Sequence, residues 1–589
     1  MAEQIVSPGV FQRETDQSFI TPAPVEVGAA IVGPTVKGPV ERPTVVTSFA
    51  DYKNKFGTTF VSASENLEFF TSIAVQKYFA NGGNSMLVTR VASGSFTAAS
   101  SSHISSSNNL SVQPFTLTTL GEGSVFNNST GLLDSGQEYT DGSLVTGSKD
   151  NLRWEITGVN PLAGTFNVTI RRGDDNRNNK IVLETFVGCS LDPKSDNYIS
   201  RVIGDQFQDT ITEAGQTFIR TKGEYANRSK FVRVASVTQT PDYLRLDGTV
   251  GTNGAGTSYS ASLPAVPGNT GSLSGSFHGA TGDNVDITHS GGVLTFNNIS
   301  ANNSQGLLSD DYTTALNILK NTDEYRFATL TIPGMYNKDH SSAVAAAVEL
   351  CEGRGDAFFI ADMVPYNAAV SDVTAESGEL NTNFAGTYWP WVQVPSVELS
   401  RNVWCPASVV MQGVYAANDR VAAPWFAPAG LNRGGLPVVR TEFKLNQSLR
   451  DTLYDNKINP IATFPRVGPV AYGQKTLQKK ASALDRINVR RLLISLKNFI
   501  GDTSKNLVFE QNTTVTRNKF LNAVNPFLES VQQRQGLYAF RVVMDETNNT
   551  AEAIDRNQLV GQIFIQPTKT AEFIILDYTI QPTGATFND

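Results

Sequence analysis

Four histidines are the first residues in this 589-residue chain whose type could support metal or acid–base chemistry. Zinc sites and metalloproteases need histidines at fixed spacings such as HExxH, or histidines combined with cysteines. His103, His278, His289 and His340 follow neither pattern. We therefore expect each to be a surface residue, or a buried residue whose hydrogen bonds are satisfied.

Three short stretches resemble binding loops but lack the residues that such loops need. GDDNRNNK at 173–180 is rich in oxygen ligands, yet it does not meet the glycine and glutamate requirements of an EF-hand, so it predicts a hairpin loop. GTNGAGTS at 251–258 lacks the lysine and the strand–helix context of a phosphate loop, and RGD at 354–356 reads as a charged helix exit. The sequence therefore predicts no catalytic residue, no metal site, no cofactor and no enzyme activity.

Composition points to a chain that contacts other protein. Charged residues make up only 17%, against roughly 25% in ordinary soluble domains, so much of the surface is expected to face protein. The net charge of -8 without a dense Lys/Arg run predicts neither a nucleic acid nor an anionic membrane partner. Three scattered cysteines indicate a reducing compartment, and no signal peptide or membrane anchor is expected.

An α/β pattern occurs on both sides of a long β-rich region. Residues 25–92 alternate strand, helix over 64–81, and strand, and the alternation resumes over 306–440. This pattern predicts one sheet with helices on its faces, built from both segments. Within the second segment, 386–394 reads as a single strand.

Between these segments, short strands separated by Gly, Asn and Asp predict one or two inserted β domains. The uncharged stretch Gly248–Gly282 divides the region, so we expect a larger β-rich domain over 93–240 and a second small one over 241–305.

The C-terminal part is predicted as an α+β domain over 441–570, followed by a terminal strand over 571–589. It has a basic helix at 474–500 and a second helix at 516–536. The basic helix carries a single acid, Asp485, and seven basic residues: Lys475, Lys479, Lys480, Arg486, Arg490, Arg491 and Lys497. Either an acidic partner or a solvated helix face would explain this charge.

The N-terminal stretch IVSPGVFQRETDQS at 5–18 reads as a strand with no hairpin turn nearby. Because the last strand lies almost at the C-terminus, both chain ends are expected to be strands whose partners lie elsewhere.

Several quoted motifs, taken in order, resemble the contractile tail sheath proteins of tailed bacteriophages, which are related to the sheaths of R-type pyocins and type VI secretion systems. The resemblance covers roughly 1–92 and 320–589 and leaves out the β insertion. It rests on these stretches: SPGV (7–10), AAIVGPTVKGPVERPTVVTSFADYKNKFG (29–57), YFANGGNSMLVTRV (78–91), CEGRGDAFFIAD (351–362), YWPWVQV (388–394), SVVMQGVYAANDRVAAPWFAPAG (408–430), LYDNKINPIATFPRVGPVAYGQKTL (453–477), INVRRLLISL (487–496), FEQNTTVTRNKF (509–520) and GLYAFRVVMDETNNT (536–550).

The resemblance implies a structural subunit of a virion tail, assembled in the host bacterial cytoplasm. Its subunits would stack as rings around a tail tube and contract to drive the tube through the host envelope, without hydrolysing nucleotide. The implied fold is α+β multidomain: an α/β sheath core interrupted by a β-rich insertion, and an α+β C-terminal domain with strand-exchange arms.

The resemblance also implies contacts. An N-terminal arm (1–24) and a C-terminal arm would each add a strand to a neighbour's C-terminal-domain sheet, using Val6, Pro8, Gly9, Val10, Phe11 and Arg13 at one end and Phe573, Ile575, Leu576, Tyr578 and Ile580 at the other. The seven basic residues of 474–500 would face the tube protein. Baseplate and tail terminator proteins are the other implied partners, and the insertion would face outward as a decoration or a host-surface binder.

Three alternatives stay open. The chain could be another structural tail or baseplate component, or a β-rich virion protein that binds or cleaves glycans through 93–310, although no persuasive pair of carboxylates supports cleavage. A secretion-system sheath is the third, but those sheaths are commonly built from two chains.

Overall fold

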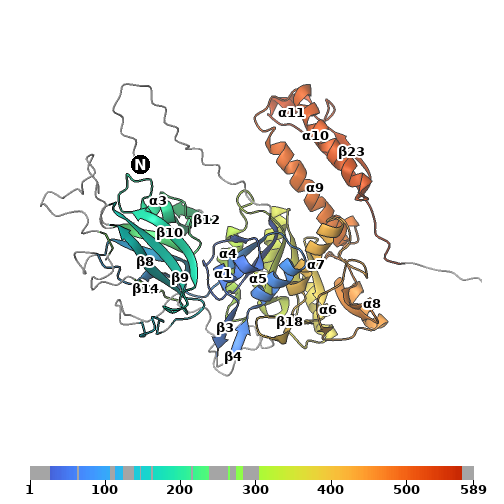
Figure 1. The fold of residues 1–589 in the computed structure, drawn as a ribbon. Helices are drawn as coiled ribbons and strands as arrows, with labels where there is room; N and C mark the ends of the chain where they lie inside the picture. The colour runs from blue at the N-terminus through green and yellow to red at the C-terminus, as the bar shows by residue number, and fades with distance from the viewer. Residues whose placement is uncertain are drawn as a thin grey trace, which may run out of the picture.

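The computed structural model describes residues 27–62, 65–106, 113–123, 138–145, 147–160, 163–213, 216–237, 263–264, 274–282 and 304–573. The fold is mixed α/β and multidomain (Figure 1). An antiparallel sheet lies on one side, a sheet covered by helices lies in the middle, and a long helical hairpin extends from the other side.

The middle part is built on an eight-stranded sheet whose six inner strands are parallel. The antiparallel strands β2 and β22 form its edges. In spatial order the strands are β2 (Thr44–Val46), β5 (Met86–Arg90), β1 (Val27–Gly33), β15 (Phe327–Tyr336), β16 (Phe358–Asp362), β17 (Ala385–Trp389), β21 (Ile458–Phe464) and β22 (Gly468–Ala471).

Helices cover both faces of this sheet, which explains its almost continuous apolar strands. Ala29 and Ile31 pack toward one face, and Ala30 and Val32 toward the other. The first face is covered by α1 (Phe49–Phe56), α2 (Phe70–Ala80) and α7 (Ser408–Val421). The second is covered by α4 (Tyr312–Ile318), α5 (Asn337–Arg354), α6 (Val370–Glu379) and α8 (Gln447–Asp455), and the 3₁₀ turn η3 (Ser309–Asp311) precedes α4.

Two local predictions in this part were wrong. The helix expected from 64 starts only at Phe70, because β4 (Glu65–Glu68) pairs with β3 (Thr59–Ser62) as a hairpin. The strand expected over 386–394 is two strands in different sheets, since Pro390 has no N–H to continue the ladder. The second of these, β18 (Val392–Ser396), pairs with β19 (Arg401–Cys405) and β20 (Arg440–Thr441).

The chain leaves the eight-stranded sheet after β5 and returns to it at β15. Between these strands it forms a seven-stranded antiparallel sheet, in which α3 (Ile199–Ile203) contacts both edge strands. In spatial order the strands are β10 (Val182–Ser190), β9 (Thr165–Arg172), β8 (Leu152–Asn160), β14 (Ser274–His278), β6 (Ala98–Ser101), β7 (Phe115–Glu122) and β13 (Val232–Val237).

The separate small domain expected over 241–305 is contradicted by β14, which pairs with both β6 and β8 inside this sheet. A further hairpin, β11 (Phe207–Glu213) with β12 (Gln216–Lys222), packs against α4 and so joins the insertion to the middle part. Within the described residues the strand content expected for this region is confirmed, whereas the strand expected at 291–296, the glycine-rich loop at 251–258 and His289 lie outside them.

The loop at 173–180 connects β9 to β10, as its hairpin prediction required. Its Asp175 is buried and forms ion pairs with Arg153 and Arg171, so its carboxylate holds the loop against the sheet.

The C-terminal domain begins later in the chain than predicted. Strands β21 and β22 and helix α8 belong to the eight-stranded sheet and its cover, so the domain boundary expected at 441 was wrong. The remaining elements are α9 (Ile487–Lys505), α10 (Thr514–Gln533), β23 (Leu537–Val543), α11 (Ala551–Asp555) and β24 (Gln562–Pro567). All of them except α11 share one apolar core, to which Ala423 and Trp425 also belong. Among the described residues, no helix is long and apolar enough to cross a membrane.

Trp154 tests whether the insertion depends on a packed core, because it is the largest completely buried side chain of the seven-stranded sheet. We expect Trp154→Ala to lower the free energy of unfolding by about 3–5 kcal/mol, measured by urea denaturation followed by circular dichroism. The matched control is Val187→Ala in β10, which is 70% exposed and should change stability by less than about 0.5 kcal/mol. Equal losses in the two variants would contradict the described core.

Candidate assembly surfaces

The hairpin of β23 and β24 is a two-stranded sheet with one covered face. Phe540 pairs with Ile565 and Val542 with Ile563, and all four side chains pack against the core of α9 and α10. On the opposite face, Phe564 is 56% exposed. Neither strand pairs with any other strand in the described part of the chain, so both outer edges present backbone groups that can accept another strand.

The arm residues predicted from the two chain ends are mostly not placed. Val6, Pro8, Gly9, Val10, Phe11 and Arg13 lie outside the described residues, as do Ile575, Leu576, Tyr578 and Ile580. Phe573 is described and its side chain is 80% exposed. The strands expected in the two arms therefore stay predictions.

The segment that leads from β24 to Phe573 is held at Glu572. The Glu572 carboxylate accepts two hydrogen bonds from Arg486, at 2.7 and 3.0 Å, and others from Gln474 and Tyr454. Burial would raise the pKa of Glu572, but these hydrogen bonds outweigh it and hold the pKa below its ordinary value. We call this cluster the root of the C-terminal segment.

The basic stretch 474–500 is not one helix. Residues before α9 form a closed loop, in which Thr476 donates a backbone hydrogen bond to Asp485 and Ser482 caps the 3₁₀ turn η4 (Ala483–Asp485). The helix begins at Ile487, because Ser482 and Asp485 favour a local turn over helix. The seven basic residues therefore do not share one helical face.

Two of the seven are buried inside the chain. Arg490 is 4% exposed, donates to the Asn383 side chain at 2.6 Å and lies over the Phe384 ring; burial lowers its pKa to about 10. Arg491 is equally buried and forms an ion pair with Asp419. Their predicted place on an exposed cationic face is wrong.

Two other basic residues of this stretch contact groups within the same chain. Lys475 donates to the Tyr454 carbonyl at 2.7 Å and lies over its ring, and Arg486 holds Glu572. Lys479, Lys480 and Lys497 are exposed. Only these three of the predicted tube-facing residues present a charge to solvent without an ion pair in the described structure.

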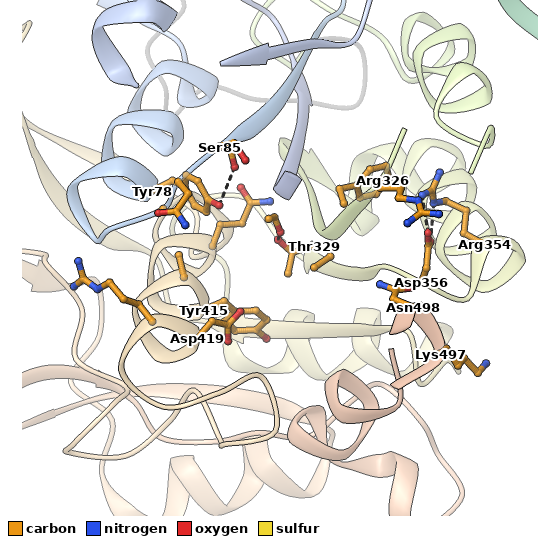
Figure 2. A pocket seen from close by; sticks show the side chains of 18 of the residues that line it. Tyr78, Ser85, Arg326, Thr329, Arg354, Asp356, Tyr415, Asp419, Lys497 and Asn498 are labelled. Carbon is orange, nitrogen blue, oxygen red and sulfur yellow. Dashed lines mark hydrogen bonds and ion pairs between the residues drawn. The ribbon is translucent and has the colours of Figure 1, made fainter. Parts of the chain in front are cut away.

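A cleft of about 510 Å³ separates α9 from the amino ends of β1, β15 and β16 (Figure 2). Arg326 crosses to α9 through two hydrogen bonds with Asp502, at 2.7 and 2.5 Å. Arg354 pairs with Asp356 beside it, where α5 ends as the charged helix exit that was predicted. The ion pair between Arg326 and Asp502 therefore holds α9 to the sheet across the cleft. The sequence could not reveal this pair, because its partners are far apart in the chain.

No group in the described residues forms a convincing reactive site. Ser309 Oγ lies 2.9 Å from Nδ1 of His340 and Ser408 Oγ lies 2.5 Å from the Asp362 carboxylate, but His340 and both members of the second pair are buried. No cluster of three or more His, Cys, Asp or Glu side chains in the described ranges could hold a metal ion. The three cysteines are unpaired and buried.

Comparisons with known proteins found similarity to phage tail sheath proteins. Residues 479–581 match the model of the phage tail sheath C-terminal domain, which includes the β23–β24 hairpin. The tail sheath protein of Vibrio phage KVP40 is 44% identical over 188 residues, 32% of this chain and 28% of the relative. That of Enterobacteria phage T4 is 40% identical over 189 residues, 32% of this chain and 29% of the relative.

A solved sheath tail protein from Listeria innocua aligns over 89% of both chains with 11% identity and a TM-score of 0.49. The matched segments span less than a third of the curated relatives' length. Residues 479–581 therefore resemble the phage tail sheath C-terminal domain, and about a third of the chain is similar to phage tail sheath proteins.

Proposed function

We propose that this protein is the structural subunit of a contractile phage tail sheath, which polymerises as stacked rings around a tail tube and contracts to drive the tube through the host envelope. The observation that supports this proposal best is the β23–β24 hairpin, which has two open edges inside the sheath domain. The open edges carry backbone groups that pair with no strand in the described structure, so strands from neighbouring subunits would complete the sheet.

The proposed arms connect subunits weakly one at a time and strongly together. Five main-chain hydrogen bonds at about 1 kcal/mol each give about 5 kcal/mol per added strand. The cost of associating two free subunits is about 4–15 kcal/mol, so one arm would scarcely form a dimer. Within a ring, further arms bind intramolecularly, which favours a polymer over a pair.

The proposed tube contact is smaller than the sequence suggested. It uses Lys479, Lys480 and Lys497, and each exposed ion pair would contribute about 0–1 kcal/mol and be screened by salt. A weak contact of this kind suits release during contraction. Baseplate and terminator proteins are the proposed partners at the ends of the polymer, within a virion assembled in the host cytoplasm, and the β insertion would face outward.

Electron microscopy of the purified protein tests the proposed function directly. Hollow helical tubes that form without a tube protein would support a sheath subunit. Discrete rings or monomers at high protein concentration would instead favour another tail or baseplate component.

Deleting residues 1–16 tests the N-terminal arm. We expect the variant to keep the melting temperature of the monomer within about 2 °C and to lose ordered polymer in electron micrographs, because the arm acts between subunits. The control replaces these residues with a Gly/Ser segment of equal length, which should also fail to polymerise. Normal tubes from either variant would contradict strand addition by this arm.

Reversing charge at Lys479, Lys480 and Lys497 together tests the tube contact. The Lys→Glu triple variant should form polymer without tube protein but should lose at least about tenfold in co-sedimentation with tubes at low salt. The control reverses Lys194, Lys230 and Lys320, which are also exposed and give the same change in net charge. Equal tube binding by both variants would exclude this surface.

Glu572→Gln tests the root of the C-terminal segment. Loss of the charged hydrogen bonds to Arg486 should weaken the root by about 1–3 kcal/mol, so amides of 568–573 should exchange roughly tenfold faster in the unpolymerised protein. Because the folded pKa of Glu572 is lowered from 4.5, its stabilising effect is present at neutral pH and is lost as the pH falls below that value.

The difference between Glu572→Gln and the unmodified protein should therefore disappear in acid. Glu529→Gln, an exposed substitution on α10, is the control and should leave exchange unchanged at every pH. A difference that persists once the carboxylate is protonated would show that its charge is not what holds the root.

A further inference from the structure

The free end of the helical hairpin exposes apolar side chains. Val508 is 61% exposed, Phe509 is fully exposed, Val515 is 66% exposed and Ile554 is 39% exposed. We call these four residues the apolar tip. The segments that carry them are joined, because Asn512 in the α9–α10 loop donates a hydrogen bond at 2.9 Å to the Gln558 carbonyl after α11.

Phe509 is costly to the isolated chain in two ways. Its ring is fully exposed, so it contributes no hydrophobic free energy to folding. Its backbone has a φ of +70°, which is unfavourable for a bulky residue. Strain of this kind is retained mainly where it serves a binding or switching role. The side chain is therefore presented outward by its backbone, in a position to enter a partner.

The tip has an acidic rim. The adjoining segments 506–515 and 545–557 carry one basic residue, Arg556, which pairs with Glu552. Their acidic residues are Glu510, Asp545, Glu546, Glu552 and Asp555. A partner should therefore combine an apolar surface with positive charge.

Such a surface exists elsewhere on this chain, along the outer side of β22. Leu431, Val467 and Tyr472 are 55%, 48% and 47% exposed. Residues 430–436 run beside β22 through hydrogen bonds that include Gly430 to Ala471, so these side chains belong to one edge. We call this surface the basic edge.

Arginines supply its charge. The segments 430–440 and 464–472 contain no acidic residue and include Arg433, Arg440 and Arg466. From α8, Arg450 lies over the rings of Phe464 and Tyr472, at 5.4 and 6.0 Å from their centroids. None of these four arginines forms an ion pair within the described ranges, although α8 also carries Asp451, which accepts a hydrogen bond from Gln447.

We propose that the apolar tip of one subunit docks on the basic edge of a second copy of this chain. The two surfaces complement each other in charge, and both are apolar at the centre. Figure 1 shows α11, at the tip, and α8, at the basic edge, at opposite ends of the α/β and C-terminal parts, so one subunit cannot satisfy its own tip.

Because tip and edge are different surfaces, the contact is heterologous and repeats in one direction as an open helix or a closed ring. The inference rests on the proposed function, since it adds a second contact to the same polymer. Unlike strand addition, this contact is made by side chains and depends on how two subunits are oriented.

Cross-linking between two different single-cysteine variants tests the contact. Phe509→Cys and Val467→Cys proteins are purified separately, mixed and oxidised, and the native cysteines do not interfere because all three are buried. We expect a disulfide-linked dimer in the mixture that neither protein forms alone. The control pairs Phe509→Cys with Val397→Cys, which is 72% exposed away from the basic edge and should give no more dimer than background.

A charge exchange gives an independent readout. Glu510→Arg and Arg466→Glu should each reduce the mixed dimer at least about fivefold, and the two changes placed on opposite partners should restore it. Absence of the mixed dimer overturns the inference whether or not tubes form. Tubes without the dimer leave the proposed function intact. Protection of Phe509→Cys from alkylation only when tube protein is added would assign the tip to the tube and also overturn the inference.

Discussion

The parallel pairing of β1 with β15 is the contact on which the other parts of the structure depend. It brings Ala30 beside Leu330, and the whole β insertion lies between them in the chain. Parallel strands require long connections and are stable only when both faces are covered. The insertion therefore has to leave the sheet and return, while helices from both halves of the sequence close over the two faces.

The same sheet positions the C-terminal hairpin. Ile487, at the start of α9, packs in the core on one face of the sheet, and Arg490 and Arg491 are buried against residues of the middle part. Farther along α9 the contact gives way to a cleft bridged by the ion pair of Arg326 and Asp502. One end of the helix is therefore fixed by burial, whereas the rest is held by partly exposed ion pairs that contribute less.

Much of the fold could be predicted from local pattern, because α5, β16 and the strands of the insertion have clear periodicity and strong turn residues. The errors arose where tertiary contacts decide. Nothing in the sequence near Glu65–Glu68 indicates that it pairs with Thr59–Ser62 instead of extending the helix at Phe70. Likewise β14 joins the insertion's sheet through partners far away in sequence.

The candidate surfaces show the same limit. Seven basic residues in one stretch suggest a cationic face, but charge in a sequence does not distinguish an exposed lysine from an arginine that is buried over Phe384. The residue types themselves carried a signal, since arginine is more weakly hydrated than lysine and suits buried ion pairs and aromatic stacking. The buried pair Arg490 and Arg491 and the exposed pair Lys479 and Lys480 follow that difference.

A sheath that changes its arrangement needs contacts of two kinds. Main-chain pairing at an open edge such as that of β24 tolerates rotation of the bodies that it connects, so it can persist through a rearrangement. Side-chain contacts between an apolar tip and a charged edge depend on orientation, so they can differ between two arrangements and store the difference in free energy. The described chain presents candidate surfaces of both kinds on separate elements, and in the proposed sheath one set would hold subunits together while the other is broken and remade.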